Sequence, residues 1–415
     1  MSSPTVRHSD IDACPGALRL HAAADGPLAR VRLPGGLLTG AQVRTLATIA
    51  ARWGDGHVEL TSRANVQLRA LTGAPAQDLA EALRGSGLLP SETHELVRNI
   101  AAVPTAGGWE VRPLVRALDR AVCAEPALAA LPGRFLFALG PVPATADLAA
   151  VEAPGGAAIL FGGRDLGLRV PVDGVVAALI AGAATFLEVR AEQSVPAWRL
   201  RELTDGPARV AALTATRLGL SPHAADPVDP ADPADPGDPA DPGDPAPRPV
   251  ATEPIGVVRQ ADGRFAAAAL APLGLLRQAQ LSALADVGEL AVTPWRGVVV
   301  LDQSRDAAAH RLQKLAETGL EVAPGSRWSG VTACAGRPGC ARALADVRHD
   351  ADAATVFGTG LPVHWVGCAR GCGSPAGEHV RVEATGDGYQ VTGPRGGGTA
   401  AAGDVGAQVT SARRA

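Results

Sequence analysis

The chain has 415 residues, of which 47% are hydrophobic and 19% charged, and its formal net charge is −4. This length allows roughly two to four modules with a sizeable buried core. No uninterrupted apolar run reaches the roughly 18 residues that span a bilayer, and the first residues lack a secretory signal pattern. We therefore expect a cytoplasmic protein with no membrane partner. Arginine is dispersed and Lys314 is the only lysine, which argues against nucleic-acid binding.

The first half of the chain reads as a small module followed by a larger one. Residues 29–33 form a short alternating strand, and Thr39 with Gln42 makes a capping box that starts a helix. Alternating segments at 58–60 and 66–68 follow. The pattern predicts a ferredoxin-like half-module over residues 12–75 and a mixed α/β domain over residues 95–205.

A Pro-Asp repeat separates the two halves, and we predict a disordered linker over residues 222–250. Regular proline denies helix and sheet hydrogen bonds, and the aspartates repel one another. Residues 224–249 hold seven Asp and one Arg, a contribution of −6, so the rest of the chain carries +2 rather than −4.

The second half repeats the first. PGGLL at 34–38 corresponds to PLGLL at 272–276, and LTSRANVQL at 60–68 corresponds to VTPWRGVVV at 292–300. These repeats predict an α+β fold in which two ferredoxin-like half-modules and two larger mixed α/β segments are related by a pseudo-twofold axis. The remaining predicted segments are a second half-module at 253–320, a cysteine-bearing domain at 325–395 and a flexible Gly/Ala-rich tail at 396–415.

Four of the six cysteines form two pairs, Cys334 with Cys340 and Cys368 with Cys372. Four thiolates arranged in this way can hold a [4Fe–4S] cluster, and the spacing is too wide for a CxxC zinc knuckle. Structural zinc, disulfides and inert core thiols are the alternatives on these residues alone. We expect the other two cysteines, Cys14 and Cys123, to be structural.

This arrangement resembles the sulfite and nitrite reductase family over about residues 14–391, the linker excluded. The resemblance implies that Cys334, Cys340, Cys368 and Cys372 hold a [4Fe–4S] cluster, with Cys372 at the junction with a tetrapyrrole. TSRANVQLR at 61–69 matches the family's T-x-R-x-x-x-Q-x-R motif, which binds tetrapyrrole carboxylates. Forked guanidinium groups suit such carboxylates. The substrate-binding residues implied by the resemblance are Arg63, Gln67, Arg69, Arg98, Asn99, Arg134 and Arg296.

Two departures favour the precorrin branch of this family. Leu136 replaces a second basic residue two places after Arg134, and Trp295 with Arg296 is typical of that branch. The resemblance then implies an oxidoreductase of monooxygenase type in aerobic cobalamin biosynthesis. It would convert precorrin-3A to precorrin-3B by O₂-dependent ring hydroxylation and lactone formation, with electrons from a donor.

The same resemblance implies a mononuclear non-haem iron, for which the sequence shows no ligand spacing. His364 and the pair His349-Asp350 lie nearest the cysteines, and no catalytic residue is assigned. One alternative is a sulfite or nitrite reductase with sirohaem as a bound cofactor. Another is a non-catalytic iron–sulfur or zinc-stabilised binding protein.

Overall fold

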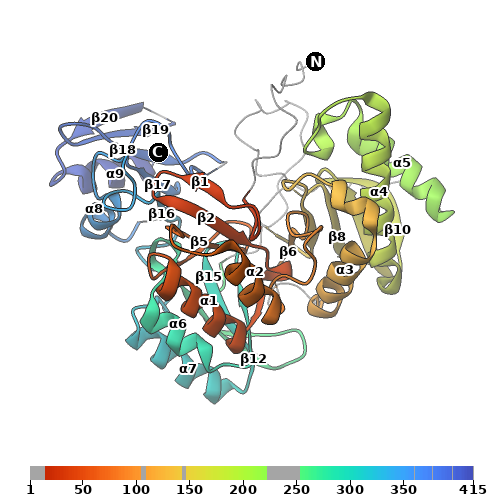
Figure 1. The fold of residues 1–415 in the computed structure, drawn as a ribbon, viewed down its shortest axis with the longest axis horizontal. Helices are drawn as coiled ribbons and strands as arrows, with labels where there is room; N and C mark the ends of the chain where they lie inside the picture. The colour runs from red at the N-terminus through yellow and green to blue at the C-terminus, as the bar shows by residue number, and fades with distance from the viewer. Residues whose placement is uncertain are drawn as a thin grey trace.

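The computed structural model describes residues 15–103, 109–142, 146–221, 253–358, 360–375, 377–394 and 396–414. Cys14 and the predicted linker at 222–250 lie outside these residues. The described chain contains a central pair of half-modules with a larger domain on each side (Figure 1). The C-terminal domain, in blue, and the domain in yellow and green flank the red and teal centre.

Two half-modules with the same order of elements form the centre. The first contains β1 (His21–Ala23), β2 (Gly26–Val31), β3 (Leu37–Thr39), α1 (Gly40–Trp53), β4 (Val58–Leu60), β5 (Val66–Leu68) and α2 (Ala76–Gly85). The second contains β11 (Gly256–Arg259), β12 (Phe265–Leu270), β13 (Leu275–Leu276), α6 (Gln278–Ala285), β14 (Glu289–Val292), β15 (Gly297–Gln303) and α7 (Arg305–Glu317). Short 3-10 turns, η1 (Pro34–Gly36) and η5 (Pro272–Gly274), precede β3 and β13.

The half-modules exchange one strand each. The first sheet has the order β1-β2-β5-β4-β13, and the second has the order β11-β12-β15-β14-β3. Leu275 of β13 pairs with Glu59 of β4, and Leu37 of β3 pairs with Ala291 of β14. Each sheet is therefore completed by a strand from the other half of the chain.

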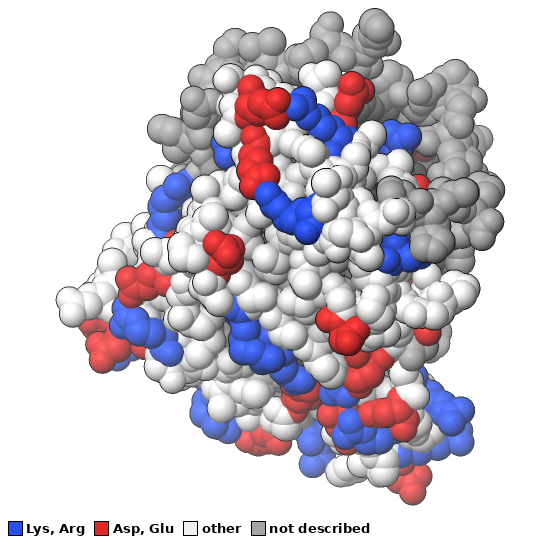
Figure 2. Space-filling view, turned by 90° about the vertical axis from the view of Figure 1, so that its right-hand side faces the viewer, with Lys and Arg blue, Asp and Glu red and all other residues white. Residues whose placement is uncertain are grey.

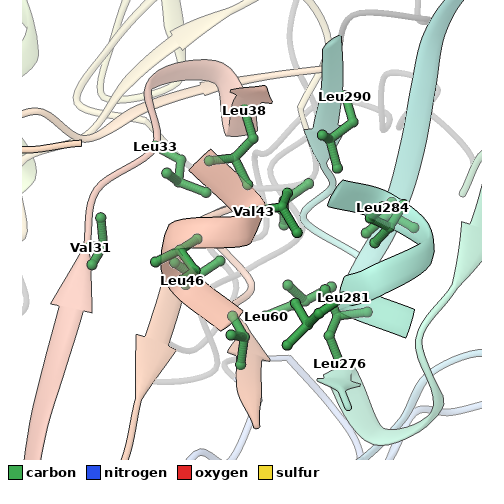
Figure 3. Packing of buried hydrophobic residues seen from close by; sticks show 14 of the residues in the cluster. Val31, Leu33, Leu38, Val43, Leu46, Leu60, Leu276, Leu281, Leu284 and Leu290 are labelled. Carbon is green, nitrogen blue, oxygen red and sulfur yellow. The ribbon is translucent and has the colours of Figure 1, made fainter. Parts of the chain in front are cut away.

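A shared hydrophobic core fixes this exchange. Figure 3 shows Val43 on the side of α1 that faces α6, and Val43, Leu46, Leu281 and Leu284 are all buried in the same core. The predicted capping box is confirmed, because Thr39 Oγ1 accepts a hydrogen bond from the Gln42 amide and the Gln42 side chain accepts one from the Thr39 amide. The cap holds the start of α1 against the exchanged strand β3.

The two flanking domains share a second topology. The first contains β6 (Ile100–Ala102), α3 (Arg112–Ala124), β7 (Phe137–Leu139), β8 (Leu148–Ala153), β9 (Gly156–Phe161), β10 (Arg164–Val170), α4 (Val175–Gln193) and α5 (Gly206–Leu218). The second contains β16 (Val331–Ala333), α8 (Val347–Ala354), β17 (Val363–Val366), β18 (Val380–Ala384), β19 (Tyr389–Gly393), β20 (Gly396–Ala400) and α9 (Val405–Arg413). In each sheet the first three strands are parallel and the last two antiparallel. The duplication predicted from the sequence therefore extends through the flanking domains.

The segment Val172–Gln193, which consists of a 3-10 turn (Val172–Gly174) and α4, is long and apolar enough to cross a membrane by length and composition, with a mean hydropathy of 1.8. The sequence does not predict this helix as an uninterrupted apolar run, because Thr185 and Glu188 lie within it. Its side chains Leu179, Phe186 and Val189 are buried in the hydrophobic core of the first flanking domain. In this fold α4 serves as the core helix of that domain.

The predicted flexible tail at 396–415 is wrong for the residues that the structure describes. β20 pairs with β19, and α9 buries Val405 and Val409. The glycines permit this pairing, because a Cβ on Gly397 would lie 2.2 Å from the Val391 carbonyl oxygen. The Gly/Ala composition therefore serves close packing at this end of the chain.

The surface turned toward the viewer in Figure 2 carries positive and negative side chains interspersed around broad uncharged areas. Apart from the atoms drawn in grey, this surface gathers no broad patch of one sign. Mixed charge of this kind is ordinary for a protein surface and gives no nucleic-acid footprint on this side.

Candidate functional site

A cavity of about 450 Å³ lies where three parts of the chain meet. One wall is the sheet of the first half-module, and a second comes from η5 and the β14–β15 turn of the second half-module. The third wall consists of the loops that follow β16 and β17. The volume is within the roughly 300–1,000 Å³ range of small-molecule sites.

Polar side chains from β2, β4 and β5 form the first wall. Successive side chains on a strand point to opposite faces, so Gln67 faces the cavity while Val66 and Leu68 are buried. Arg30 Nε donates a hydrogen bond to Gln67 Oε1 at 3.0 Å, and Gln67 Nε2 donates one to Glu59 Oε2 at 3.1 Å. The predicted strand face therefore exists as a connected polar network.

Arg69, at the end of this wall, is fully occupied by carboxylates. Its Nε and Nη2 donate to the two oxygens of Asp25 at 2.6 and 2.9 Å, and its Nη1 donates to Glu59 at 3.3 Å. Burial disfavours the charge of Arg69, but Glu59 and Asp25 outweigh burial and raise its pKa. Its positive charge is neutralised within the protein before any ligand binds.

The second half-module carries no such polar face. The positions that match Arg30, Glu59, Gln67 and Arg69 by strand register are Ala268, Ala291, Val299 and Leu301. These four residues are buried in a small apolar cluster. The duplicated fold thus presents a polar wall on one half-module and a filled apolar core on the other.

The predicted cysteines form the opposite wall. Cys334 follows β16 and Cys368 follows β17, and the backbone amide of Cys334 donates to the Trp365 carbonyl at 2.9 Å. These strands are parallel neighbours, so the segments that follow them leave the sheet at one edge. Cys334, Cys340, Cys368 and Cys372 all line the cavity as free thiols.

The cysteine loops fit an iron–sulfur cluster. The Gly367 amide donates a hydrogen bond to Cys334 Sγ at 3.2 Å. Burial raises the pKa of this thiol, and the amides of Gly367 and Gly336 oppose that rise. A Cβ on Gly367 would lie 2.7 Å from Ala343 Cβ, so only glycine lets the two loops approach. Amides that point at thiolates stabilise and tune such clusters.

The arrangement does not suit a single metal ion. In the part of the chain that the structure describes, no group of three or more His, Cys, Asp or Glu side chains closes on one ion. A cubane cluster spreads its four thiolates over four iron atoms, so its cysteines need not converge on one point. The described residues also supply no two-His, one-carboxylate set for a mononuclear iron.

His364 lies in the cavity wall behind the cysteine loop and is almost fully buried. Its Nε2 donates to the Cys372 carbonyl at 3.0 Å, and its Nδ1 accepts from the Thr332 hydroxyl at 2.7 Å. Burial lowers the pKa of His364 to about 4, so the ring is neutral at pH 7. Both ring nitrogens are engaged in fixing the loop that carries Cys372.

Four of the predicted substrate-binding residues lie outside the cavity wall. Arg98 is buried and forms a two-bond ion pair with Asp119, at 2.7 and 2.8 Å. Asn99 donates to the carbonyls of Leu96 and Gly133. These contacts hold the first flanking domain together.

The other two of these residues, Arg63 and Arg134, join the half-module to that domain. Arg63 Nη1 donates to the Arg134 carbonyl at 3.3 Å, and the Arg134 guanidinium lies over the Trp198 ring at 4.9 Å. Gln67, Arg69 and Arg296 are the predicted substrate-binding residues that do line the cavity.

The sequence patterns did not predict several of the residues that line the cavity. Arg30 occupies the strand position opposite Gln67, and Arg342 and Arg370 lie within the two cysteine loops. Glu59 pairs with Arg348 of α8, whose Nε donates to the Cys334 carbonyl at 3.1 Å. Alternation along β2 was a signal for Arg30, but the Glu59–Arg348 pair joins residues 289 positions apart and has no local signal.

Comparison with known proteins shows which proteins this chain resembles. Residues 21–86 match the family model of the nitrite/sulfite reductase ferredoxin-like half domain. Precorrin-3B synthase of Sinorhizobium sp is 29% identical over 410 residues, which cover 93% of this chain and 83% of that protein. The chain therefore resembles the nitrite/sulfite reductase-like family along most of its length.

Two further proteins show the same resemblance, one in sequence and one in fold. A ferredoxin–nitrite reductase of Leptolyngbya laminosa is 32% identical over 121 residues, which cover 26% of this chain and 24% of the relative. The solved structure of the Mycobacterium tuberculosis NirA protein matches with a TM-score of 0.65 and 20% identity, over 92% of this chain and 79% of that one. The predicted nitrite/sulfite reductase-like α+β fold is thereby confirmed.

Proposed function

We propose that this protein is an oxidoreductase of cobalamin biosynthesis that converts precorrin-3A to precorrin-3B. The observation that carries the proposal is that one cavity has four cysteines on one wall and arginines on the facing walls. Likeness to a precorrin-3B synthase over 93% of the chain supports the choice of substrate. A cytoplasmic location and the use of O₂ and an electron donor belong to the same proposal.

The cysteine wall supports the electron-transfer part of the proposal. Cys334, Cys340, Cys368 and Cys372 would hold a [4Fe–4S] cluster, which transfers one electron at a time when bound. Gly367 would stabilise the Cys334 thiolate through its amide, and His364 would hold the Cys372 peptide in place. The cluster would thus lie at the edge of the cavity that receives the substrate.

The arginine-bearing walls support the binding part of the proposal. The substrate is a reduced tetrapyrrole that carries many carboxylates, and guanidinium groups bind carboxylates through two parallel hydrogen bonds. Arg296, Arg342 and Arg370 line the cavity from the walls that face β2, β4 and β5. Overall the reaction would add one oxygen atom of O₂ to the substrate, reduce the other to water, and consume two electrons and two protons.

The direct test is turnover under ¹⁸O₂. Anaerobically prepared protein is mixed with precorrin-3A, ¹⁸O₂ and a chemical electron donor, and the product is analysed by mass spectrometry. We expect a product that has gained one labelled oxygen atom. Unchanged precorrin-3A with fully loaded protein would contradict the proposal.

A sirohaem-dependent nitrite or sulfite reductase is the second candidate, favoured by the partial likeness to ferredoxin–nitrite reductases. It requires a tightly bound tetrapyrrole in the resting protein and oxidation of a reduced donor by nitrite or sulfite. The same preparation tests both requirements, because sirohaem has sharp absorption bands that a bare iron–sulfur cluster lacks.

A further inference from the structure

The arginines that line the cavity fall into two groups. Arg69 is paired with Asp25 and Glu59, and Arg30 donates to Gln67. The side chains of Arg296, Arg342 and Arg370 form no hydrogen bond or ion pair with any residue that the structure describes. The cavity guanidinium groups that make no hydrogen bond or ion pair with the described residues therefore lie away from the strand motif.

Arg296 is the strongest member of the second group because the fold holds it in position. It occupies a tight turn in which its amide donates to the Thr293 carbonyl at 2.9 Å, and its φ is 64°. Gly274 makes room for its side chain, since a Cβ there would lie 2.6 Å from Arg296 Cδ. Arg296 is partly buried, and this burial lowers its pKa against the attraction of the Glu59 carboxylate. A partly desolvated cation in a cavity wall, with no hydrogen-bond or ion-pair partner among the described residues, indicates an anionic ligand.

Arg342 and Arg370 extend this positive region along the cysteine loops. Each follows a cysteine by two residues, Cys340 and Cys368 respectively, and both are exposed. Their side chains are free to move toward a ligand, in contrast to Arg337 of the same loop, whose Nε donates to the Ala343 carbonyl at 2.7 Å. The three unpaired cations come from two walls of one cavity, so a ligand that reaches all three must carry several anionic groups.

We propose that Arg296, Arg342 and Arg370 bind the carboxylates of the tetrapyrrole, whereas the Asp25–Arg69–Glu59 ion pairs are structural. This inference rests on the proposed function and deepens it. It moves carboxylate recognition from the strand motif to the opposite walls. The ligand class is a macrocyclic polycarboxylate, and recognition depends on charge-assisted hydrogen bonds from Arg side chains to its carboxylates.

The test uses uroporphyrin, an octacarboxylate porphyrin, as the probe. Its fluorescence is titrated with the cluster-loaded protein at two salt concentrations. The double variant Arg342→Gln/Arg370→Gln should bind at least roughly tenfold more weakly and with a smaller salt dependence, because two charge-assisted contacts are lost. Arg296→Gln, which lies outside the cysteine loops, should weaken binding by a similar factor. Arg305→Gln, an exposed arginine at the start of α7, is the matched control and should bind like the wild type.

The outcomes separate the two proposals. If the wild type binds no uroporphyrin, the proposed tetrapyrrole function fails and the inference fails with it. If the wild type binds and both the double variant and Arg296→Gln retain its affinity within about twofold, the inference alone is wrong. Should the double variant lose its cluster absorption, Arg296→Gln decides by itself, since it leaves both cysteine loops unchanged.

Discussion

Glu59 joins the polar sheet wall to the cysteine loops through one carboxylate. It accepts hydrogen bonds from Gln67 and Arg69 and pairs with Arg348, which also donates to the Cys334 carbonyl. All of these side chains are mostly buried, so the pairs are poorly screened by water. Removing one charge from such a network leaves the others desolvated and unpaired.

The variant Glu59→Gln should lower the free energy of unfolding by about 2–4 kcal/mol, because Arg69 and Arg348 lose a buried partner. Urea unfolding measures the change. Glu188→Gln removes an exposed pair with Arg217 and is the matched control, expected to cost under about 1 kcal/mol. An equal decrease in the free energy of unfolding of the two variants would show that the ion pairs of Glu59 stabilise the fold no more than an exposed pair does.

The cysteine assignment is tested at single residues. Cys372→Ser should abolish the iron–sulfur absorption, because a cubane then lacks one of its four thiolates. Cys123→Ser changes a half-buried thiol of α3 that lies outside the cavity wall, and it should retain the absorption. Normal iron content in Cys372→Ser would contradict the ligand assignment.

Glu253 gives the protein a predictable pH dependence. Burial raises the pKa of its carboxyl from the ordinary 4.5 to about 7, against a hydrogen bond from Ser329. Between these two pH values the folded protein binds a proton that the unfolded chain has released, so this contribution to stability is full below pH 4.5 and falls as pH rises through 7. In the wild type we expect this group to lower the free energy of unfolding by roughly 2–3 kcal/mol between pH 5 and 8, and Glu253→Gln should not show this decrease.

Thermal and urea unfolding at several pH values measure this dependence. Glu317→Gln, on the exposed end of α7, is the control and should keep the wild-type slope. A Glu253→Gln variant whose slope equals that of the wild type would mean that Glu253 is ionised in the folded protein at pH 5.

At the scale of elements, the exchanged strands β3 and β13 couple the two halves of the chain. Leu276 of β13 is buried in the core shared by α1 and α6 and pairs with Val58 of β4. Because each sheet ends in a strand from the other half-module, we expect a substitution that destabilises one exchanged strand to destabilise both half-modules.

Leu276→Ala should therefore destabilise both half-modules together, by about 2–5 kcal/mol from the cavity that it leaves. Hydrogen exchange followed by mass spectrometry reads β4 and β14 separately. We expect their protection to fall by the same factor. Loss of protection in β4 alone would mean that the half-modules unfold independently.

For the whole molecule, repeated patterns made the duplication predictable. The matched segments at 34–38 and 272–276 contain the turns η1 and η5, and the cysteine pairs follow adjacent parallel strands. The strand exchange was not predictable, because β3 and β13 fit either sheet by alternation alone and tertiary packing decides between them.

The positions of site residues were predictable where strand alternation sets the direction of a side chain. They were not predictable where an ion pair with a distant residue decides its contacts. Alternation placed Gln67 and Arg69 on the cavity wall, but nothing local shows that Asp25 and Glu59 occupy Arg69. Motif likeness placed Arg98 in the site, whereas Asp119 of α3 binds it inside the flanking domain. The carboxylate that a motif arginine binds is decided by the tertiary fold, so the motif alone does not predict it.

The most direct test of the account is an absorption spectrum of the anaerobically purified protein, with iron and acid-labile sulfide counted on the same sample. We predict a broad iron–sulfur shoulder, about four iron atoms and about four sulfides per chain for the cubane, and no sharp tetrapyrrole bands. Sirohaem bands that co-purify with the protein would contradict the account, because the cavity would then hold a resident cofactor in place of the substrate.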